Sequence, residues 1–305
     1  MKPEGSPVVR AGPGGDALAV AGALVTGASS TIMQLAGTSA STVAFYRCLY
    51  ALPFLLLLAR RESKRPGRLS PRQAALGVGA GAFLAADLIL WFDSIRGVGA
   101  GLATVLQDSQ VMFVAAGGWL AFGTRPSPRL MRLLPVMLAG VWLVSGQVGG
   151  GSLRHVAIQG TLSGVASALA YAVFLLLIGR NADSRHQRNA AFMTLVTAST
   201  AVSAFVAGAA TGTLRLVPTW PSAGWLILLA ITTQVLGWLL IATALTRSTS
   251  AQASVALLLQ PTAAVLLAWA FLSERPAPVQ LGGVVIVVAA ATVAVRSGPG
   301  PATVD

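Results

Sequence analysis

The feature that most constrains this chain is a series of apolar stretches of about 20 residues that recurs from one end to the other. A stretch of that length lets an α-helix cross the ~30 Å hydrocarbon core of a bilayer. Only 10% of the 305 residues are charged, whereas soluble domains carry about 25%. The sequence therefore predicts an all-α polytopic membrane protein.

We expect ten transmembrane helices joined by connections too short to form a soluble domain. Lys2 and Arg10 precede the first span, as basic residues do in a signal peptide. That span is too long for a signal-peptide core and lacks a clear A-x-A site, so we expect a helix. The predicted spans are 17–37, 40–59, 73–95, 99–122, 132–149, 159–180, 189–211, 222–245, 250–272 and 278–296.

Cysteine and histidine usage argues against two other kinds of site. Cys48 is the single cysteine, so the chain cannot form an internal disulfide. His155 and His186 fall in predicted loops, without Cys, Asp or Glu at the spacing of metal ligands. We expect neither a metal site nor a cofactor.

The basic residues are distributed unevenly between the predicted loops. With both termini in the cytoplasm, that side receives 16 of the 21 Lys and Arg residues, and the other side receives Arg96, Arg154, Arg215 and Arg275. This asymmetry is what the positive-inside rule describes. It accounts for the net charge of +12 without a nucleic-acid partner. The basic 60–72 loop is interpreted as a topology anchor, with binding to anionic lipid headgroups as the alternative.

Two segments separated by 150 residues resemble each other. WLAFGTRPSP begins at Trp119 and WAFLSERPAP begins at Trp269, and Gln110 and Gln260 match at the same offset. The repeat divides the ten spans into two halves of five, residues 1–150 and 151–305. Because five is odd, the second half must enter the membrane in the opposite orientation. This predicts an inverted repeat, with a substrate site near the midplane between the halves.

Pro261 lies within the ninth predicted span. A proline at membrane depth is tolerated where a neighbouring helix or water satisfies the carbonyl that it frees. We therefore expect a kink or a broken helix beside a cavity at this position.

The C-terminal stretch resembles the signature of the drug/metabolite transporter superfamily, specifically its ten-helix permeases built from two EamA domains. The match consists of Pro261, the turn Leu272-Ser273-Glu274-Arg275-Pro276 and the following Gly282-Gly283. Arg47, early in the second span, also fits the family. The resemblance covers essentially the whole chain. It implies a small-solute permease of the cytoplasmic membrane, commonly an exporter, and not an enzyme.

The first half departs from this signature at two positions. Val111 stands where the repeat partner has Pro261, and Thr124 stands where it has Glu274. The departures concern the details of the fourth span.

Charged residues within the spans are the first candidates for the transport pathway, because each costs about 2.5–3.5 kcal/mol to insert. Arg47, Asp87 and Asp108 lie at a common predicted depth, so an arginine–aspartate contact is possible. Either Arg47 and one aspartate hold helices together, or one aspartate is free to bind a proton or a cationic group of the substrate. Asp93 lies closer to the outer interface and to Arg96, which favours a boundary role.

Polar and aromatic residues extend this candidate surface. Trp91 follows Asp87 by four residues on one helix face, and Tyr171 continues a stripe of serines in the sixth span. The alternative for such residues is hydrogen bonding between helices or ordinary packing. The predicted substrate-binding residues are Gln34, Arg47, Asp87, Trp91, Asp108, Gln110, Tyr171, Gln234, Trp238 and Gln260.

We predict a secondary transporter of metabolites, amino acids or drugs, with proton coupling as a further hypothesis. No Walker motif is present, so energy would come from an ion or substrate gradient. An intramembrane lipid-modifying enzyme is a second class, but it would need paired acids at the membrane surface, and the cytoplasmic loops are basic. A channel or sensor is a third class that saturable countertransport would distinguish.

Overall fold

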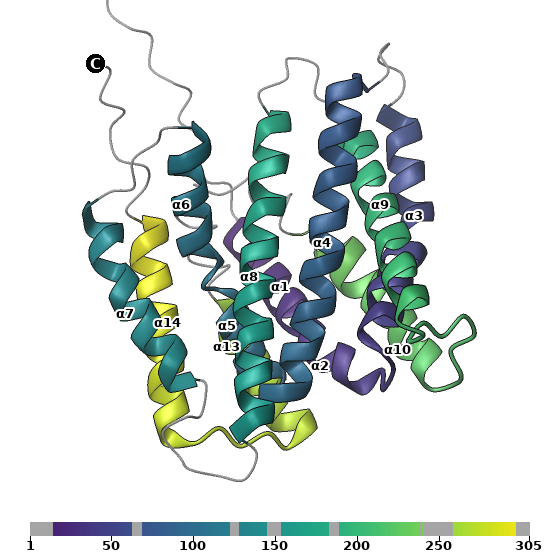
Figure 1. Ribbon diagram of the computed structural model, residues 1–305. Coiled ribbons are helices and arrows are strands. Elements are labelled where there is room, and N and C mark those ends of the chain that lie inside the picture. Colours follow the sequence, from purple (N-terminus) through teal and green to yellow (C-terminus); the bar gives the residue numbers. More distant parts are fainter. Residues whose placement is uncertain are drawn as a thin grey trace, which may run out of the picture.

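The helices account for every regular element in the described part of the chain. The computed structural model describes residues 15–62, 69–122, 128–144, 154–182, 189–237, 240 and 259–296, and these residues contain no strand. The elements, shown in Figure 1, are α1 (Gly15–Gly27), α2 (Ser29–Leu35), α3 (Ala40–Glu62), α4 (Pro71–Val98), α5 (Ala100–Gln107), α6 (Gln110–Phe122), α7 (Pro128–Val144), α8 (Arg154–Ala182), α9 (Asn189–Ala210), α10 (Ser222–Leu229), the π-helix η2 (Ala230–Gly237), α13 (Leu259–Leu272) and α14 (Pro278–Arg296).

The surface of the bundle is suited to lipid. Within the described residues, four helices are long and apolar enough to cross a bilayer by length and composition, namely those at Ala40–Arg61, Pro71–Val98, His155–Arg180 and Ala190–Ala210. Large apolar side chains also face outward, including Leu120 at 85% exposure and Phe271 at 68%. Monomeric soluble proteins rarely expose contiguous apolar patches of this kind. The chain is therefore a multi-pass membrane protein, as the sequence predicted.

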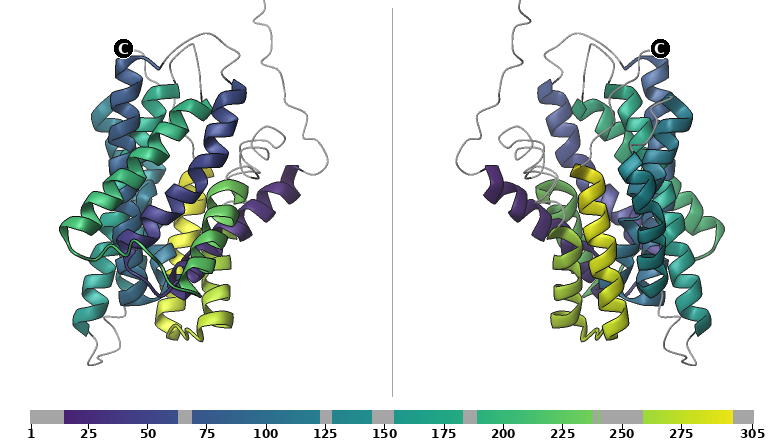
Figure 2. Two further views of the ribbon diagram at one scale, coloured as in Figure 1. Left: turned by 90° about the vertical axis from the view of Figure 1, so that its right-hand side faces the viewer. Right: turned by 90° about the vertical axis from the view of Figure 1, so that its left-hand side faces the viewer.

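The helices run up and down the bundle and define two ends. α3 ends and α4 begins at the upper end in Figure 1, which we call the Arg61 end. α4 ends and α5 begins at the opposite end, which we call the Gly99 end, together with the turn 273–277 between α13 and α14. Figure 2 shows the same alternation from two sides. α6 and α8 end, and α7 and α9 begin, at the Arg61 end as well.

Helices at the same position in the two halves pack against each other. α3 packs on α9, α5 on α13, and α7 on α14. These pairs correspond to the second and seventh, fourth and ninth, and fifth and tenth predicted spans. This pairing fits a two-repeat architecture.

Three predicted spans are divided in the structure. The span 17–37 becomes α1 and α2, with Ala28 between them, and the span 99–122 becomes α5 and α6, with Asp108 and Ser109 between them. The span 222–245 begins as α10 and continues as the π-helix η2. Each was predicted as a single span, without a division at these positions. In α5–α6 the turn uses hydrogen bonds to the residue three positions back, as a 3₁₀ helix does.

Pro261 occupies the first turn of the described part of α13, where it is buried. Residues 241–258 lie outside the described residues, so the predicted kink falls partly outside them. The Gln260 carbonyl packs tightly against α1, because a Cβ added at Gly27 would lie 2.7 Å from the Gln260 oxygen. The described chain therefore shows a close helix–helix approach at this proline.

The turn after α13 contacts the first half of the chain. Glu274 accepts hydrogen bonds from the backbone N–H of Ala100 through Oε1 at 2.8 Å and from Gly101 through Oε2 at 3.3 Å. A carboxylate at a helix N-terminus satisfies free N–H groups and complements the helix dipole. Gly99 has a φ of +94°, and a Cβ there would lie 2.7 Å from the Glu274 Oε2. Glycine is thus required for Glu274 to cap α5.

Close packing of α4 on α8 sets the position of the polar centre. A Cβ added at Gly97 would lie 2.5 Å from the Cα of Gly160, so the two backbones touch at the Gly99 end. Small residues permit such approaches between membrane helices. Because α8 begins at Arg154, His155 lies in its first turn and not in the predicted loop.

Candidate functional site

Asp87 is the centre of a buried polar cluster. Its side chain is 1% exposed. Its Oδ1 accepts hydrogen bonds from Ser167 Oγ at 2.6 Å and from Gln107 Nε2 at 2.9 Å. Among the described residues, no donor reaches Oδ2. Three helices, α4, α5 and α8, therefore meet at one carboxylate.

Arg47 belongs to the same region but makes different hydrogen bonds from those expected. Its Nε donates to Gln234 Oε1 at 2.9 Å, and its Nη1 lies 4.0 Å from Met33 Sδ. It also interacts electrostatically with Asp87 and Tyr171. The direct partner of Arg47 is thus an amide and not an aspartate, although Asp87 is close enough to balance part of its charge.

The π-helix η2 supplies that amide. A π-helix widens the backbone spiral and is most often found at functional sites. Here Gln234 of η2 lies against α3. The Thr233 hydroxyl donates a hydrogen bond to the Leu229 carbonyl at 2.7 Å. The irregular backbone lies within the predicted span, with Thr233 and Gly237 buried and Ile231 and Leu236 exposed.

Asp108 lies apart from this cluster. It is the C-cap of α5, and its Oδ2 is buried without a hydrogen-bond partner among the described residues. Gln110 Oε1 is also buried without a hydrogen-bond partner among the described residues. Arg47 does not interact electrostatically with Asp108.

The remaining predicted residues are distributed around the centre. Gln34 has a buried Oε1 without a described partner, as has the Nε1 of Trp91, a side chain that is 4% exposed. Tyr171 packs on Phe174 with ring centroids 5.2 Å apart. Gln260 is partly buried at the start of α13. Trp238 lies outside the described residues.

Sequence reasoning missed Gln107. Its position beside Asp108 offered a signal, because a carboxamide next to a carboxylate is rare in an apolar span. Ser167 was noticed as part of a serine stripe but was not counted among the site residues. Both donate to Asp87 from other helices, and pairing across helices cannot be deduced from spacing within one helix.

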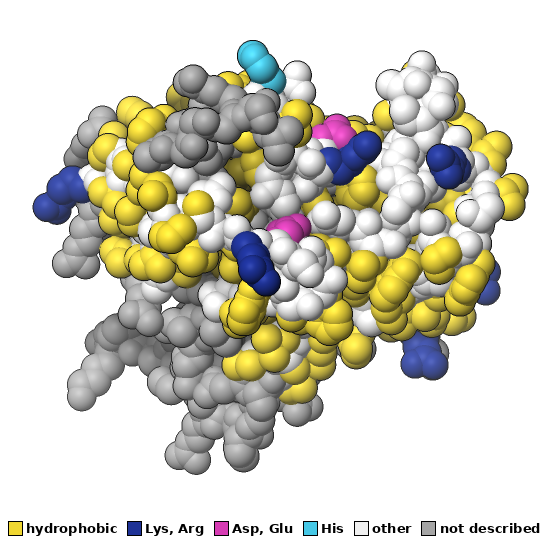
Figure 3. All heavy atoms as spheres, turned by 90° about the horizontal axis from the view of Figure 1, so that it is seen from below, with side chains coloured by type: hydrophobic (Ala, Val, Ile, Leu, Met, Phe, Trp, Pro, Cys, Tyr) yellow, Lys and Arg dark blue, Asp and Glu magenta, His cyan; other side chains and the backbone are white. Residues whose placement is uncertain are grey.

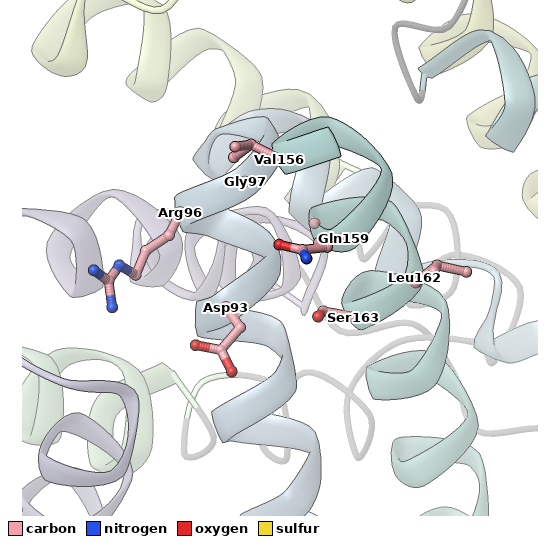
Figure 4. Close-up of a pocket in the computed structure, with 8 residues that line it drawn as sticks. Asp93, Arg96, Gly97, Val156, Gln159, Leu162 and Ser163 are labelled. Carbon is pink, nitrogen blue, oxygen red and sulfur yellow. The ribbon is translucent and has the colours of Figure 1, made fainter. Parts of the chain in front are cut away.

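A second polar feature lies at the Gly99 end. A hollow of about 590 Å³ lies along the contact between the ends of α4 and α8, and Figure 4 shows its lining residues: Asp93, Arg96, Gly97, Val156, Gln159, Gly160, Leu162 and Ser163. Figure 3 views the molecule from this end, where a few charged side chains stand among extensive hydrophobic surface. Asp93 interacts electrostatically with Arg96 and is exposed, in keeping with a boundary position.

The arrangement offers ionic and amide groups to a ligand and no group of metal ligands. Within the described residues, no three His, Cys, Asp or Glu side chains are grouped so as to hold a metal ion. The buried carboxylate, guanidinium and amides instead suit recognition of a polar molecule, or exchange of a small cation.

Comparison with known proteins addresses the family directly. No curated protein matches the sequence. A solved crystal structure, described only as that of a protein, has 14% sequence identity, covers 92% of this chain and 96% of its own, and superposes with a TM-score of 0.61. That likeness shows the fold alone. The model of the EamA-like transporter family matches residues 13–146 and 158–296, once in each half. The chain therefore belongs to the EamA-like transporter family.

Proposed function

We propose that this transporter exports small polar solutes across the cytoplasmic membrane by alternating access. The observation that carries the proposal is the buried centre at which Asp87 joins α4, α5 and α8. Intramembrane ionisable groups are costly and usually mark a substrate or ion pathway. In transporters with internal repeats, rocking of one half against the other exposes such a site to each side in turn.

The solute would bind between the Asp87 cluster and the Arg47–Gln234 pair. The carboxylate and the guanidinium supply opposite charges from different helices, and the amides of Gln107 and Gln234 supply donors and acceptors. Trp91 and Tyr171 add apolar and aromatic surface near them. This combination favours metabolites, amino acids or drugs that carry both polar and apolar groups.

We further propose that Asp108 exchanges the proton that drives export. The sequence left Asp87 and Asp108 as alternatives, and the position of Arg47 supports a choice between them. Arg47 interacts electrostatically with Asp87, so Asp87 is the better structural partner. A buried carboxylate oxygen without a donor gains most from binding a proton, because an unpaired buried charge is costly.

The orientation follows from the charge distribution. The basic 60–72 loop and both termini would face the cytoplasm. The Gly99 end, with Arg96 and Arg275, would face outward.

Transport by purified protein in proteoliposomes tests the proposal. Solutes are screened by counterflow, which needs no gradient, and then under an imposed pH gradient. Asp108→Asn should lose pH-driven transport and retain counterflow, whereas Asp93→Asn, an exposed acid outside the centre, should retain both. Absence of saturable counterflow for every solute class in folded protein would refute the carrier. Full pH-driven transport by Asp108→Asn would refute only the coupling role.

A further inference from the structure

The break between α5 and α6 leaves two backbone oxygens without their helical partners. The N–H of Asp108 donates to the Val105 carbonyl at 3.2 Å, and the N–H of Val111 donates to the Asp108 carbonyl at 3.3 Å. In an α-helix these N–H groups would donate to the carbonyls of Thr104 and Gln107. For Gln107, the last residue of α5, no backbone N–H of the following described residues takes the place of the missing one. The Gln107 carbonyl oxygen is therefore available at the break.

Two side-chain oxygens in the same segment also lack partners. Asp108 Oδ2 and Gln110 Oε1 are buried without hydrogen bonds among the described residues. Leaving a buried acceptor unpaired costs about 1–3 kcal/mol. With the carbonyl of Gln107, segment 104–110 thus contains three oxygen acceptors with no matching donor among the described residues.

The electrostatics of this segment favour a positive charge. The C-terminus of α5 carries the negative end of a helix dipole, and Asp108 adds a carboxylate. α2 and α13, which pack on α5, carry no charged residue. α4 carries Arg72, Asp87, Asp93 and Arg96, and α8, which also packs on α5, carries Arg154 and Arg180. None of these interacts electrostatically with Asp108.

We propose that the oxygens at this break form a binding site for one Na⁺ ion. A hard cation prefers carboxylate and carbonyl oxygens, and a single carboxylate balances one positive charge. Unwound backbone carbonyls and half-helix C-termini are the groups that coordinate coupling ions in transporters with broken helices. The inference deepens the proposed function, on which it rests for its role in transport: Na⁺ and the coupling proton are alternative occupants of the Asp108 carboxylate, and each excludes the other.

Binding of radioactive ²²Na⁺ to the purified full-length chain tests the site without a known solute. Wild-type protein should bind Na⁺ saturably, and Asp108→Asn should abolish binding. Gln110→Ala should weaken binding by about tenfold or more, as loss of a supporting group does at ion sites. Asp93→Asn is the matched control, since it removes an exposed acid elsewhere, and it should bind as the wild type does. Gln110→Ala also serves if Asp108→Asn fails to fold.

Each outcome decides one of the two proposals. Folded wild-type protein that shows counterflow but no saturable Na⁺ binding would overturn the site and leave the transporter intact. Equal Na⁺ binding by wild type and Gln110→Ala would overturn the assignment to segment 104–110. Saturable binding lost in Asp108→Asn, together with no solute exchange by wild type, would support the cation site and refute the transport proposal.

Discussion

Replacement of Glu274 by glutamine should weaken the contact that holds α5 to the second half of the chain. Both carboxylate oxygens accept backbone N–H groups, at 2.8 Å and 3.3 Å. A glutamine retains one acceptor but turns an amide N–H₂ toward the other N–H, and it removes the charge from the helix N-terminus. Hydrogen bonds to charged groups contribute about 1.5–3 kcal/mol and the dipole about 0.3–1 kcal/mol. We expect a net loss of about 1–3 kcal/mol.

Two measurements follow from this magnitude. The melting temperature in detergent should fall by a few degrees, since about 2–4 °C accompany each kcal/mol in chains of this order of size. If the outward-open state breaks the contact, as rocking of the halves at the Gly99 end requires, the same loss should favour that state. A change of about 1–3 kcal/mol shifts the equilibrium by roughly 5–150-fold. Labelling of an engineered cysteine at the Gly99 end would report the shift.

Arg275→Gln provides the control. Arg275 is the next residue in the same exposed turn, and its replacement alters the local charge without touching α5. It should leave both the melting temperature and the labelling unchanged. If Glu274→Gln behaved like Arg275→Gln in both measurements, the carboxylate would not cap α5 and the reasoning would be refuted.

Three further predictions concern topology, packing and the polar centre. Cysteines that replace Arg61 and Val217 in a chain without Cys48 should label from opposite sides of intact cells. Labelling of both from outside would refute the predicted topology. Gly27→Ala should destabilise the fold by about 1–3 kcal/mol through overpacking, because its Cβ would lie 2.7 Å from the Gln260 oxygen, whereas Gly179→Ala meets nothing within 4 Å and should be neutral in thermal unfolding. Asp87→Asn should lower the yield of folded protein, since it removes the charge nearest to the buried guanidinium; a normal yield with normal counterflow would assign Asp87 no role in either.

The membrane class and the family were predictable from sequence because both depend on properties that sum along the chain. Span length, low charge and the 150-residue repeat each involve many residues, so no single substitution obscures them. The paired R-P-x-P turns at Arg125 and Arg275 made the two halves visible. The family model matches the chain twice, over residues 13–146 and 158–296.

The helix breaks were not predictable in the same way. Pro261 suggested a break in the ninth span, whereas the break in the fourth span lies at Asp108 and Ser109, where neither glycine nor proline occurs. Apolar periodicity continues through this point, so the sequence reads as one helix. The break depends instead on tertiary contacts. Glu274 accepts a hydrogen bond from the N-terminus of α5, and Gln107 at its C-terminus donates one to Asp87.

The short helix α5 joins the features on which the proposed mechanism depends. Its N-terminus is held by Glu274 of the second half, and its last residue donates to Asp87. Its C-cap is Asp108, whose Oδ2 is buried without a partner among the described residues. Because the helix has only eight residues, it can move as a rigid body about the turn at Asp108. A displacement of the second half at the Gly99 end would therefore pull on Gln107 and change the spacing of the oxygens around Asp108. An ion bound at those oxygens would in turn favour one position of α5, so that ion binding and access to the solute site become linked through a single element.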